Sequence, residues 1–202
     1  MSYVIDPPKQ TVAAVSGGGL FPVRRIFCIG RNYADHVREM GGDPKASPPV
    51  FFTKPADAVV PDGADIPYAQ ATSNLHYEGE LVVALKRGGK DQARAKDAGA
   101  PWDTAKAFDA SAPLGEIFPA ENAGDLSRAR LQTLVNGETR QDAPLAAMIW
   151  SVEDIIAALS AQFELKAGDL IFTGTPEGVG ALKPGDEVKI AIGALSVSFR
   201  IS

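Results

Sequence analysis

Short apolar runs, separated by glycine and proline, constrain this chain more than any other feature of its sequence. The 20 Gly and 15 Pro among 202 residues mark many turns and loops and leave little room for long helices. Residues 23–30 form a run with the length and side-chain branching of a buried strand. We therefore expect a β-rich domain rather than a helical bundle.

Two segments nevertheless predict helices. Ser151 is a good N-cap, and Ile155, Leu159 and Phe163 recur at steps of four, which predicts a helix packed on a sheet. A shorter helix is expected after Asn32 and is stopped by two glycines at 41–42, and residues 92–100 also favour helix.

Strand pairing is predicted at two further points. The dipeptide Asn136-Gly137 is a strong hairpin signal after a strand expected over Leu126–Asn136. The alternating residues Leu195–Ile201 are expected to close the fold as an antiparallel pair with the segment before them.

The whole-chain properties narrow the function. The length suits one main domain, expected over residues 21–202, preceded by a strand and turn over residues 1–20. A net charge of −5 does not indicate the excess of basic residues that is typical of nucleic-acid binding. No run of 18 apolar residues predicts a membrane span. Cys28 is the only cysteine, so no intramolecular disulfide forms. We expect a cytoplasmic protein whose partners are small molecules.

Glu78 and Glu80 are the first candidates for chemistry. Successive side chains of an extended segment alternate, so these two carboxylates point the same way and repel each other unless a cation lies between them. Mg²⁺ prefers such oxygen ligands. The alternative is a strand whose solvent face carries two glutamates.

A second candidate is the pair His36 and Glu39, which stand at i and i+3 on the expected short helix. A carboxylate on one imidazole nitrogen fixes the tautomer and makes the other nitrogen a general base for water. The alternative is an exposed histidine beside an incidental charge.

Two further positions suit a charged substrate. Lys106 lies among small and aromatic residues and can polarise a carbonyl or pair with a carboxylate. The glycine-rich loop at Thr173–Pro176 offers backbone N–H groups and hydroxyls to an anion, or is a plain tight turn.

Five motifs in order resemble one known family. The chain is similar to the fumarylacetoacetate hydrolase family, and to its acylpyruvase and fumarylpyruvate hydrolase branch, from about Phe21 to the C-terminus. The motifs are Gly30–Met40, Phe52–Pro55, Asn74–Leu81, Val135–Glu138 and Thr173–Gly180.

The resemblance implies an α+β, β-rich fold, a mixed β-sheet roll with short helices that forms a homodimer. It implies hydrolysis of a C–C bond in a 1,3-diketo acid, with fumarylpyruvate as leading substrate in aromatic catabolism. The products are pyruvate and a carboxylic acid, and the cofactor is Mg²⁺ or Mn²⁺.

The resemblance also assigns residues. It implies Glu78 and Glu80 as metal ligands and His36 with Glu39 as the dyad that activates water. It gives Lys106 a catalytic role, and it implies as substrate-binding residues Arg31, Gln92, Gly174 and Thr175.

Other activities stay open on the same site. Oxaloacetate decarboxylation and isomerisation of a related dioic acid use the same metal-stabilised enolate. A member of the family that has lost catalysis is the alternative of another class.

One departure from the family is large. The resemblance implies a third metal-binding Asp, with an Arg near it, in a segment of roughly two dozen residues after the Glu78–Glu80 strand. Here the chain passes from Gly88 to Gln92 without that segment. Either a segment is missing from the sequence near 88–93, or the protein has lost it. The first is favoured, because deleting a central strand leaves unpaired backbone groups and an open core. A Cα step far above about 3.8 Å in this region would prove the omission.

Overall fold

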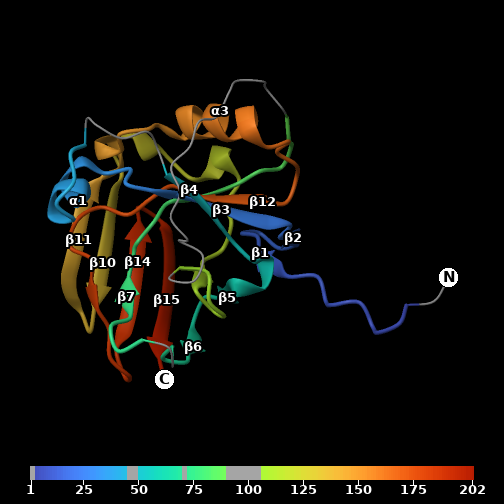
Figure 1. Cartoon of the computed structure of the whole chain (residues 1–202), viewed down its shortest axis with the longest axis horizontal. Coiled ribbons are helices and arrows are strands. Elements are labelled where there is room, and N and C mark those ends of the chain that lie inside the picture. Colours follow the sequence, from blue (N-terminus) through green and yellow to red (C-terminus); the bar gives the residue numbers. More distant parts are fainter. Residues whose placement is uncertain (1–2, 45–49, 70–71, 90–105) are drawn as a thin grey trace.

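The computed structural model describes residues 3–44, 50–69, 72–89 and 106–202 (Figure 1). Strands dominate, and within these ranges the α-helices are α1 (Ala34–Glu39) and α3 (Val152–Gln162). The expected β-rich α+β fold is therefore confirmed.

A four-stranded mixed sheet forms the centre. Its order is β4 (Val50–Lys54), β3 (Arg25–Gly30), β12 (Asp169–Phe172) and β8 (Val82–Ala84). β12 runs parallel to β3, while β4 and β8 run antiparallel to their neighbours. All four residues of β12 are buried, as expected for a strand covered on both faces.

A five-stranded sheet packs beside it. Its order is β11 (Glu138–Pro144), β10 (Arg130–Val135), β14 (Glu187–Ile192), β15 (Leu195–Ile201) and β6 (Ala64–Ile66). The hairpin between β10 and β11 turns at Asn136 and Gly137, both with positive φ, as the dipeptide predicts. The expected closing pair is β14 and β15, which run antiparallel.

Shorter elements connect the two sheets. The paired short strands are β1 (Val12–Ala14) with β2 (Leu20–Pro22), β5 (Val59–Pro61) with β9 (Ala112–Leu114), and β7 (His76–Tyr77) with β13 (Gly180–Ala181). The 3₁₀ turns are η1 (Ala56–Ala58), η2 (Ala120–Asn122), η3 (Leu126–Arg128) and η4 (Leu145–Ala147).

Helix α3 covers one face of the central sheet, at the top of Figure 1. It begins with a capping box in which the Ser151 hydroxyl accepts from the Asp154 N–H and the Asp154 carboxylate accepts from the Ser151 N–H. Ile155 and Leu159 are fully buried in one cluster with Phe27 of β3. The predicted helix and its cap are confirmed.

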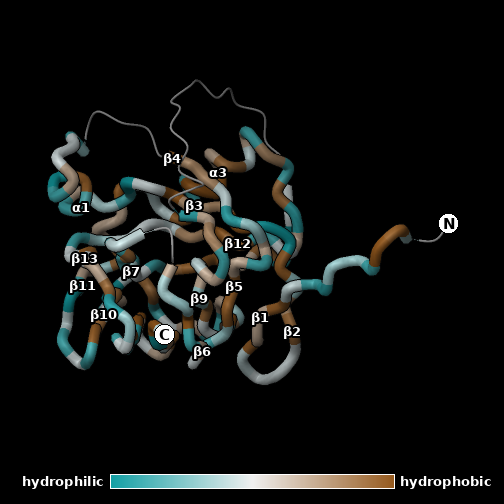
Figure 2. Tube along the Cα trace, turned by 60° about the horizontal axis from the view of Figure 1, so that its bottom comes forward, coloured by the Kyte–Doolittle hydropathy of each residue, from teal (hydrophilic) through white to brown (hydrophobic). Residues whose placement is uncertain are grey.

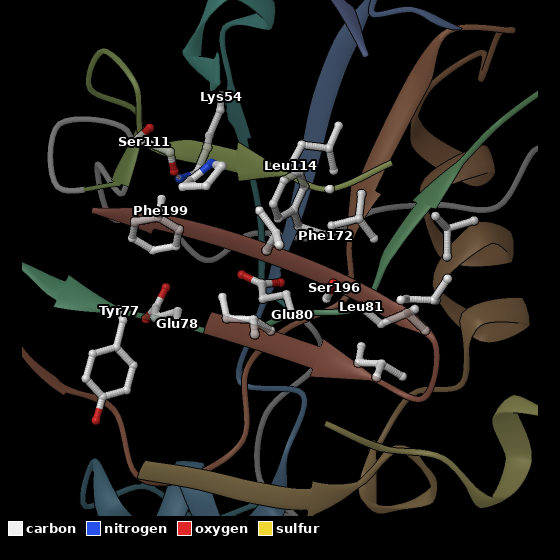
Figure 3. A pocket seen from close by; sticks show the side chains of 18 of the residues that line it. Lys54, Tyr77, Glu78, Glu80, Leu81, Ser111, Leu114, Phe172, Ser196 and Phe199 are labelled. Carbon is white, nitrogen blue, oxygen red and sulfur yellow. Dashed lines mark hydrogen bonds between the residues drawn. The ribbon is translucent and has the colours of Figure 1, made fainter. Parts of the chain in front are cut away.

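The opposite face of the central sheet borders a large cavity of about 1370 Å³. Apolar side chains line it, among them Phe172 of the central sheet, Phe199 of the five-stranded sheet and Leu114 of β9 (Figure 3). Sites for small molecules usually measure about 300–1,000 Å³, so this cavity exceeds what one small substrate fills.

The N-terminal residues 3–9 extend away from the body of the molecule, and their apolar start is visible in Figure 2. Tyr3, Val4 and Ile5 are 79–101% exposed. Leu20, at the start of β2, is also exposed.

Two predicted strands differ from the structure. Glu78 and Glu80 lie in an irregular link between β7 and β8, because the Gly79 N–H donates to the side chain of Gln141 on β11 rather than to the backbone of a neighbouring strand. The expected strand over Leu126–Asn136 starts only at Arg130, because η3 takes the first turn, capped by Asp125.

The helix expected over 92–100 lies outside the described residues, as does most of the region near 88–93 where a missing segment was predicted. No α-helix among the described residues is long and apolar enough to cross a bilayer.

Candidate active site

Six of the predicted site residues meet at one small cavity of about 20 Å³, which has room for roughly one water molecule. They come from the end of β3, from α1, from the β7–β8 link, from the start of the 106–111 stretch and from the loop after β12. These residues are Arg31, His36, Glu78, Glu80, Lys106 and Thr175.

Glu80 is the most perturbed carboxylate of the site. One of its oxygens accepts a hydrogen bond from the Gly174 N–H at 2.5 Å. Burial and then the neighbouring Glu78 charge raise the pKa of Glu80 to about 7, although the Gly174 N–H, Lys106 and Lys54 act in the opposite sense. The charges of Glu78 and Glu80 therefore repel each other unless a cation compensates them.

Lys106 supplies part of that compensation. Its ammonium donates to both oxygens of Glu78 at 2.5 and 2.7 Å, and both side chains are about three-quarters buried. The Ser111 hydroxyl donates to the Lys106 carbonyl at 3.2 Å, and Lys54 donates to the Ser111 carbonyl. This chain of contacts holds Lys106 against the carboxylates rather than away from them (Figure 3 shows Lys54, Ser111 and both glutamates).

The predicted dyad is in contact. His36 is buried on α1, and its Nδ1 lies 3.3 Å from a Glu39 carboxylate oxygen. Because a carboxylate only accepts, Nδ1 donates, and Nε2 of the neutral ring keeps its lone pair. Glu39 also accepts from the Gly178 N–H at 3.3 Å, which ties α1 to the loop after β12.

Arg31 reaches this cavity from a strained backbone position with φ of +63°. The next residue, Asn32, is fully buried and fixes that geometry. Its amide donates to the Thr173 carbonyl at 2.8 Å and its oxygen accepts from the Trp150 N–H at 2.7 Å. Gly174 passes so close that a Cβ there would lie 2.9 Å from the Asn32 Cβ.

Sequence reasoning missed Gln141, a buried residue of β11 that joins two parts of the site. Its amide donates to the Thr175 hydroxyl and to the Pro176 carbonyl, both at 2.9 Å, and its oxygen accepts from the Gly79 N–H at 3.0 Å. Gln141 therefore fixes the backbone between Glu78 and Glu80. The available signal was alternation, because Gln141 shares the inward face of β11 with Ala143.

The donor set fits a hard divalent cation in part. Glu78 and Glu80 present carboxylate oxygens to one cavity, and Mg²⁺ commonly binds one or two carboxylates while keeping water ligands. No group of three or more His, Cys, Asp or Glu that could hold a metal occurs among the described residues. Gln92 lies outside the described residues.

Two carboxylates, a histidine held by a glutamate and a lysine meet in this site, and this set of groups is typical of the class of enzymes that use a divalent cation on a small, negatively charged substrate. The family model described as fumarylacetoacetate (FAA) hydrolase C-terminal matches residues 25–99 and 89–200. The chain belongs to the fumarylacetoacetate hydrolase family.

Particular members are close to it. The solved structure of a fumarylpyruvate hydrolase from Pseudomonas aeruginosa, in complex with Mn²⁺ and pyruvate, has 41% identity and a TM-score of 0.93 over 99% of each chain. A fumarylpyruvate hydrolase from Ralstonia sp is 38% identical over 162 residues, 68% of this chain and 84% of the relative. The mitochondrial oxaloacetate tautomerase FAHD1 of Homo sapiens is 39% identical over 203 residues, 88% of this chain and 91% of the relative.

These alignments contain a gap in this chain. The human alignment spans 203 positions, but 88% of 202 residues is about 178, so about 25 positions have no residue here. The Ralstonia alignment gives the same number, because 68% of 202 is about 137 of 162 positions. The family model breaks into two matches that meet at residues 89–99, which places the break after β8.

Proposed function

We propose that this protein hydrolyses a C–C bond of a 1,3-diketo acid, with fumarylpyruvate as substrate and pyruvate and fumarate as products. The observation that carries the proposal is the small cavity where a base, a lysine and two carboxylates converge. The likeness to the Pseudomonas enzyme, which was solved with Mn²⁺ and pyruvate, supports it.

Glu78 and Glu80 are the proposed ligands of Mg²⁺ or Mn²⁺. When bound, the cation supplies positive charge for the 2-oxo acid end of the substrate and for the enolate that leaves. Without the cation, the Lys106 ammonium donates to the Glu78 carboxylate and compensates its charge. Once the substrate is present, we assign Lys106 to the negative charge of the 2-oxo acid end and of the enolate.

His36 is the proposed general base. Glu39 holds Nδ1, so Nε2 is the atom that takes a proton from the attacking water. Arg31, Gly174 and Thr175 are the proposed seat of the substrate's charged end, with Gln92 as a further contact.

The first test is pyruvate release from fumarylpyruvate with Mn²⁺, by the parent protein and by Glu80→Gln. We expect the variant to lose about 100-fold or more in kcat, because it removes a carboxylate ligand of the cation that stabilises the negative charge of the transition state. Glu187→Gln is the matched control, since Glu187 is exposed on β14. Equal rates for Glu80→Gln and the control would reject the metal assignment.

His36→Asn separates the base from the ligands. We expect a loss of about 10²–10⁴-fold in kcat, with Mn²⁺ affinity by calorimetry unchanged. A parallel loss of Mn²⁺ binding would contradict the assigned role.

Oxaloacetate tautomerisation is the second candidate, and the human relative of that name supports it. A tautomerase moves one proton and releases no acid, so its keto–enol change is followed by ultraviolet absorbance on oxaloacetate. Decarboxylation of oxaloacetate would instead release pyruvate. Comparing the three rates on one preparation identifies the activity, and no activity on any of them would favour the non-catalytic alternative.

The finer features remain proposals. We propose a homodimer in the cytoplasm that serves aromatic catabolism, and the exposed apolar side chains of residues 3–5 and of Leu20 support the dimer. The division of the chain into residues 1–20 and 21–202 stays a prediction.

A further inference from the structure

Tyr77 is a buried aromatic residue next to a proposed metal ligand, yet its hydroxyl does not serve the metal site. The residue is 6% exposed on β7. Figure 3 shows its hydroxyl pointing away from Glu78 and Glu80. The hydroxyl donates instead to the Gly178 carbonyl at 2.8 Å, in the loop after β12. The same loop also contacts α1 through Glu39, so Tyr77 and α1 meet at Gly178.

The register of β7 and β13 brings the ring to this position. Tyr77 is the cross-strand partner of Gly180 in this antiparallel pair. A Cβ on Gly180 would lie 3.0 Å from the Tyr77 hydroxyl oxygen, so the ring lies across a residue that has no side chain. The hydroxyl therefore reaches Gly178, two residues before that partner, which is a diagonal contact within reach of aromatic side chains on paired strands.

Gly178 is restrained on three sides. Its φ of +88° lies in the region that favours glycine, and a Cβ there would lie 2.2 Å from the Arg140 carbonyl oxygen of β11. Its carbonyl accepts from Tyr77, and its N–H donates to the two carboxylate oxygens of Glu39 at 3.3 and 3.4 Å. Because this N–H and this carbonyl flank one Cα, the bond to Tyr77 also restrains the direction of the N–H.

The position of the Glu39 carboxylate depends on that N–H. Glu39 is the last residue of α1, a helix of six residues, and its side chain is 44% exposed. So short a helix has little stability of its own, and an exposed glutamate side chain loses rotamer freedom when it is fixed. The bonds from Gly178 hold the carboxylate where one oxygen lies 3.3 Å from Nδ1 of His36.

The contact with Glu39 decides which nitrogen of His36 is free. The tautomer of an imidazole ring is set by the hydrogen bond that its other nitrogen makes. With Nδ1 donating to Glu39, Nε2 has the lone pair that accepts a proton.

We propose that Tyr77 is a positioning residue for the general base. Its hydroxyl holds Gly178, and the Gly178 N–H orients Glu39. Glu39 in turn keeps His36 in the tautomer whose Nε2 accepts the proton. This inference rests on the role of His36 in the proposed function, and in it Tyr77 acts through Gly178 rather than on the substrate.

Tyr77→Phe tests the proposal, because it removes the hydroxyl and keeps the ring. Nitrogen NMR of the imidazole rings reports the tautomer, and the chain has 2 histidines, so His36→Asn identifies the signals of His36. The spectra are recorded at about pH 8, above the ordinary histidine pKa of about 6.5. We expect the parent protein to carry the proton on Nδ1 and Tyr77→Phe to populate both tautomers.

The kinetics of Tyr77→Phe give a second measurement. We expect kcat on fumarylpyruvate to fall about 10-fold, which is part of the about 10²–10⁴-fold that a general base contributes. KM and the Mn²⁺ affinity measured by calorimetry should stay unchanged, because the hydroxyl points away from Glu78 and Glu80.

Two further variants separate positioning from stability. Tyr68→Phe is the matched control, since the Tyr68 hydroxyl also bonds to the backbone, accepting from the Leu75 N–H at 3.3 Å. It should leave the His36 tautomer and kcat as in the parent. Glu39→Ala should itself release the tautomer, and adding Tyr77→Phe to Glu39→Ala should change neither the tautomer nor kcat further, because the hydroxyl acts through Glu39.

The outcomes distinguish this inference from the proposed function. A tautomer change in Tyr77→Phe without turnover of fumarylpyruvate by the parent would support the positioning role and reject the hydrolase. The positioning role itself would be overturned by a parent His36 with its proton on Nε2, or by a Tyr77→Phe spectrum equal to that of Tyr68→Phe. Additive losses in the double variant, or a rise in KM with kcat unchanged, would also overturn it.

Discussion

At the scale of single residues, Gln141 shows how a side chain without its own chemistry controls a site. It contacts the backbone between the two proposed metal ligands and the hydroxyl of Thr175. Each buried group left unpaired costs about 1–3 kcal/mol, and loss of such supporting contacts typically lowers metal affinity or activity about 10–100-fold.

We expect Gln141→Ala to lower Mn²⁺ affinity by about 10–100-fold, because Gly79 is no longer held between Glu78 and Glu80. Calorimetric titration measures the affinity and thermal unfolding measures the stability. Gln162→Ala, at an exposed position on α3, is the control. A variant that loses stability but binds Mn²⁺ normally would make Gln141 purely structural.

Asp169 gives a pH dependence to the stability. Its carboxylate is fully buried, and although burial raises its pKa, the hydrogen bonds from Arg25, from the Lys166 N–H and from Arg24 outweigh that effect and leave the pKa below its usual range. A lowered pKa in the folded state stabilises the protein above the unfolded value of about 3.9, and the contribution disappears as pH falls through the folded pKa.

Asp169→Asn is therefore expected to cost about 3 kcal/mol at pH 7, since it leaves two arginines without their shared partner. Urea unfolding at several pH values measures the difference from the parent. The difference should shrink below about pH 4. A difference that stays constant down to pH 2.5 would refute the assignment.

At the scale of elements, the sequence predicts what local contacts decide. Ser151 as N-cap and the four-residue steps of Ile155, Leu159 and Phe163 were sufficient to predict α3, and Asn136-Gly137 was sufficient for the β10–β11 hairpin. The link at Glu78–Glu80 was predicted as strand and is irregular, because Gln141 and Gly174 bond to it from distant parts of the chain. Local propensity carries no information about such partners.

Ser151→Ala tests the helix cap. The substitution removes the hydroxyl that accepts from the Asp154 N–H, so we expect a loss of about 1 kcal/mol and a fall of about 2–4 °C in the unfolding midpoint. Ser160→Ala, late in the same helix, should change the midpoint less, because that hydroxyl only donates back to the Ala157 carbonyl. Calorimetry of both variants provides the comparison.

Some contacts of the candidate site could likewise be predicted from the sequence, and others could not. The convergence of Glu78 and Glu80 was predicted from strand alternation although the structure places both in an irregular link, and the contact between His36 and Glu39 followed from helical spacing. The approach of Lys106 to Glu78 did not, because it depends on how the 106–111 stretch folds against β4 through Lys54. Asn32 and Gln141 were missed, since a buried polar side chain has no signature until its neighbours are known.

At the scale of the whole molecule, the proposed homodimer makes a prediction about association. Leu20 is 69% exposed at the start of β2, and residues 3–9 of the N-terminal arm are exposed as well. We expect Leu20→Lys to shift sedimentation from dimer toward monomer at low protein concentration, because a charge would enter an apolar contact. Lys183→Glu, a charge change elsewhere, is the control, and equal sedimentation of both variants would move the interface to another face.

The parallel pairing of β3 with β12 also has a temporal consequence. Arg25 and Asp169 are 144 residues apart in sequence, yet they adjoin in the central sheet. During synthesis, β3 leaves the ribosome long before its parallel partner β12 exists, and loop closure over such a distance is slow. Nascent chains that end before Phe172 should stay sensitive to protease, and resistance should arise only after most of the polypeptide has been made.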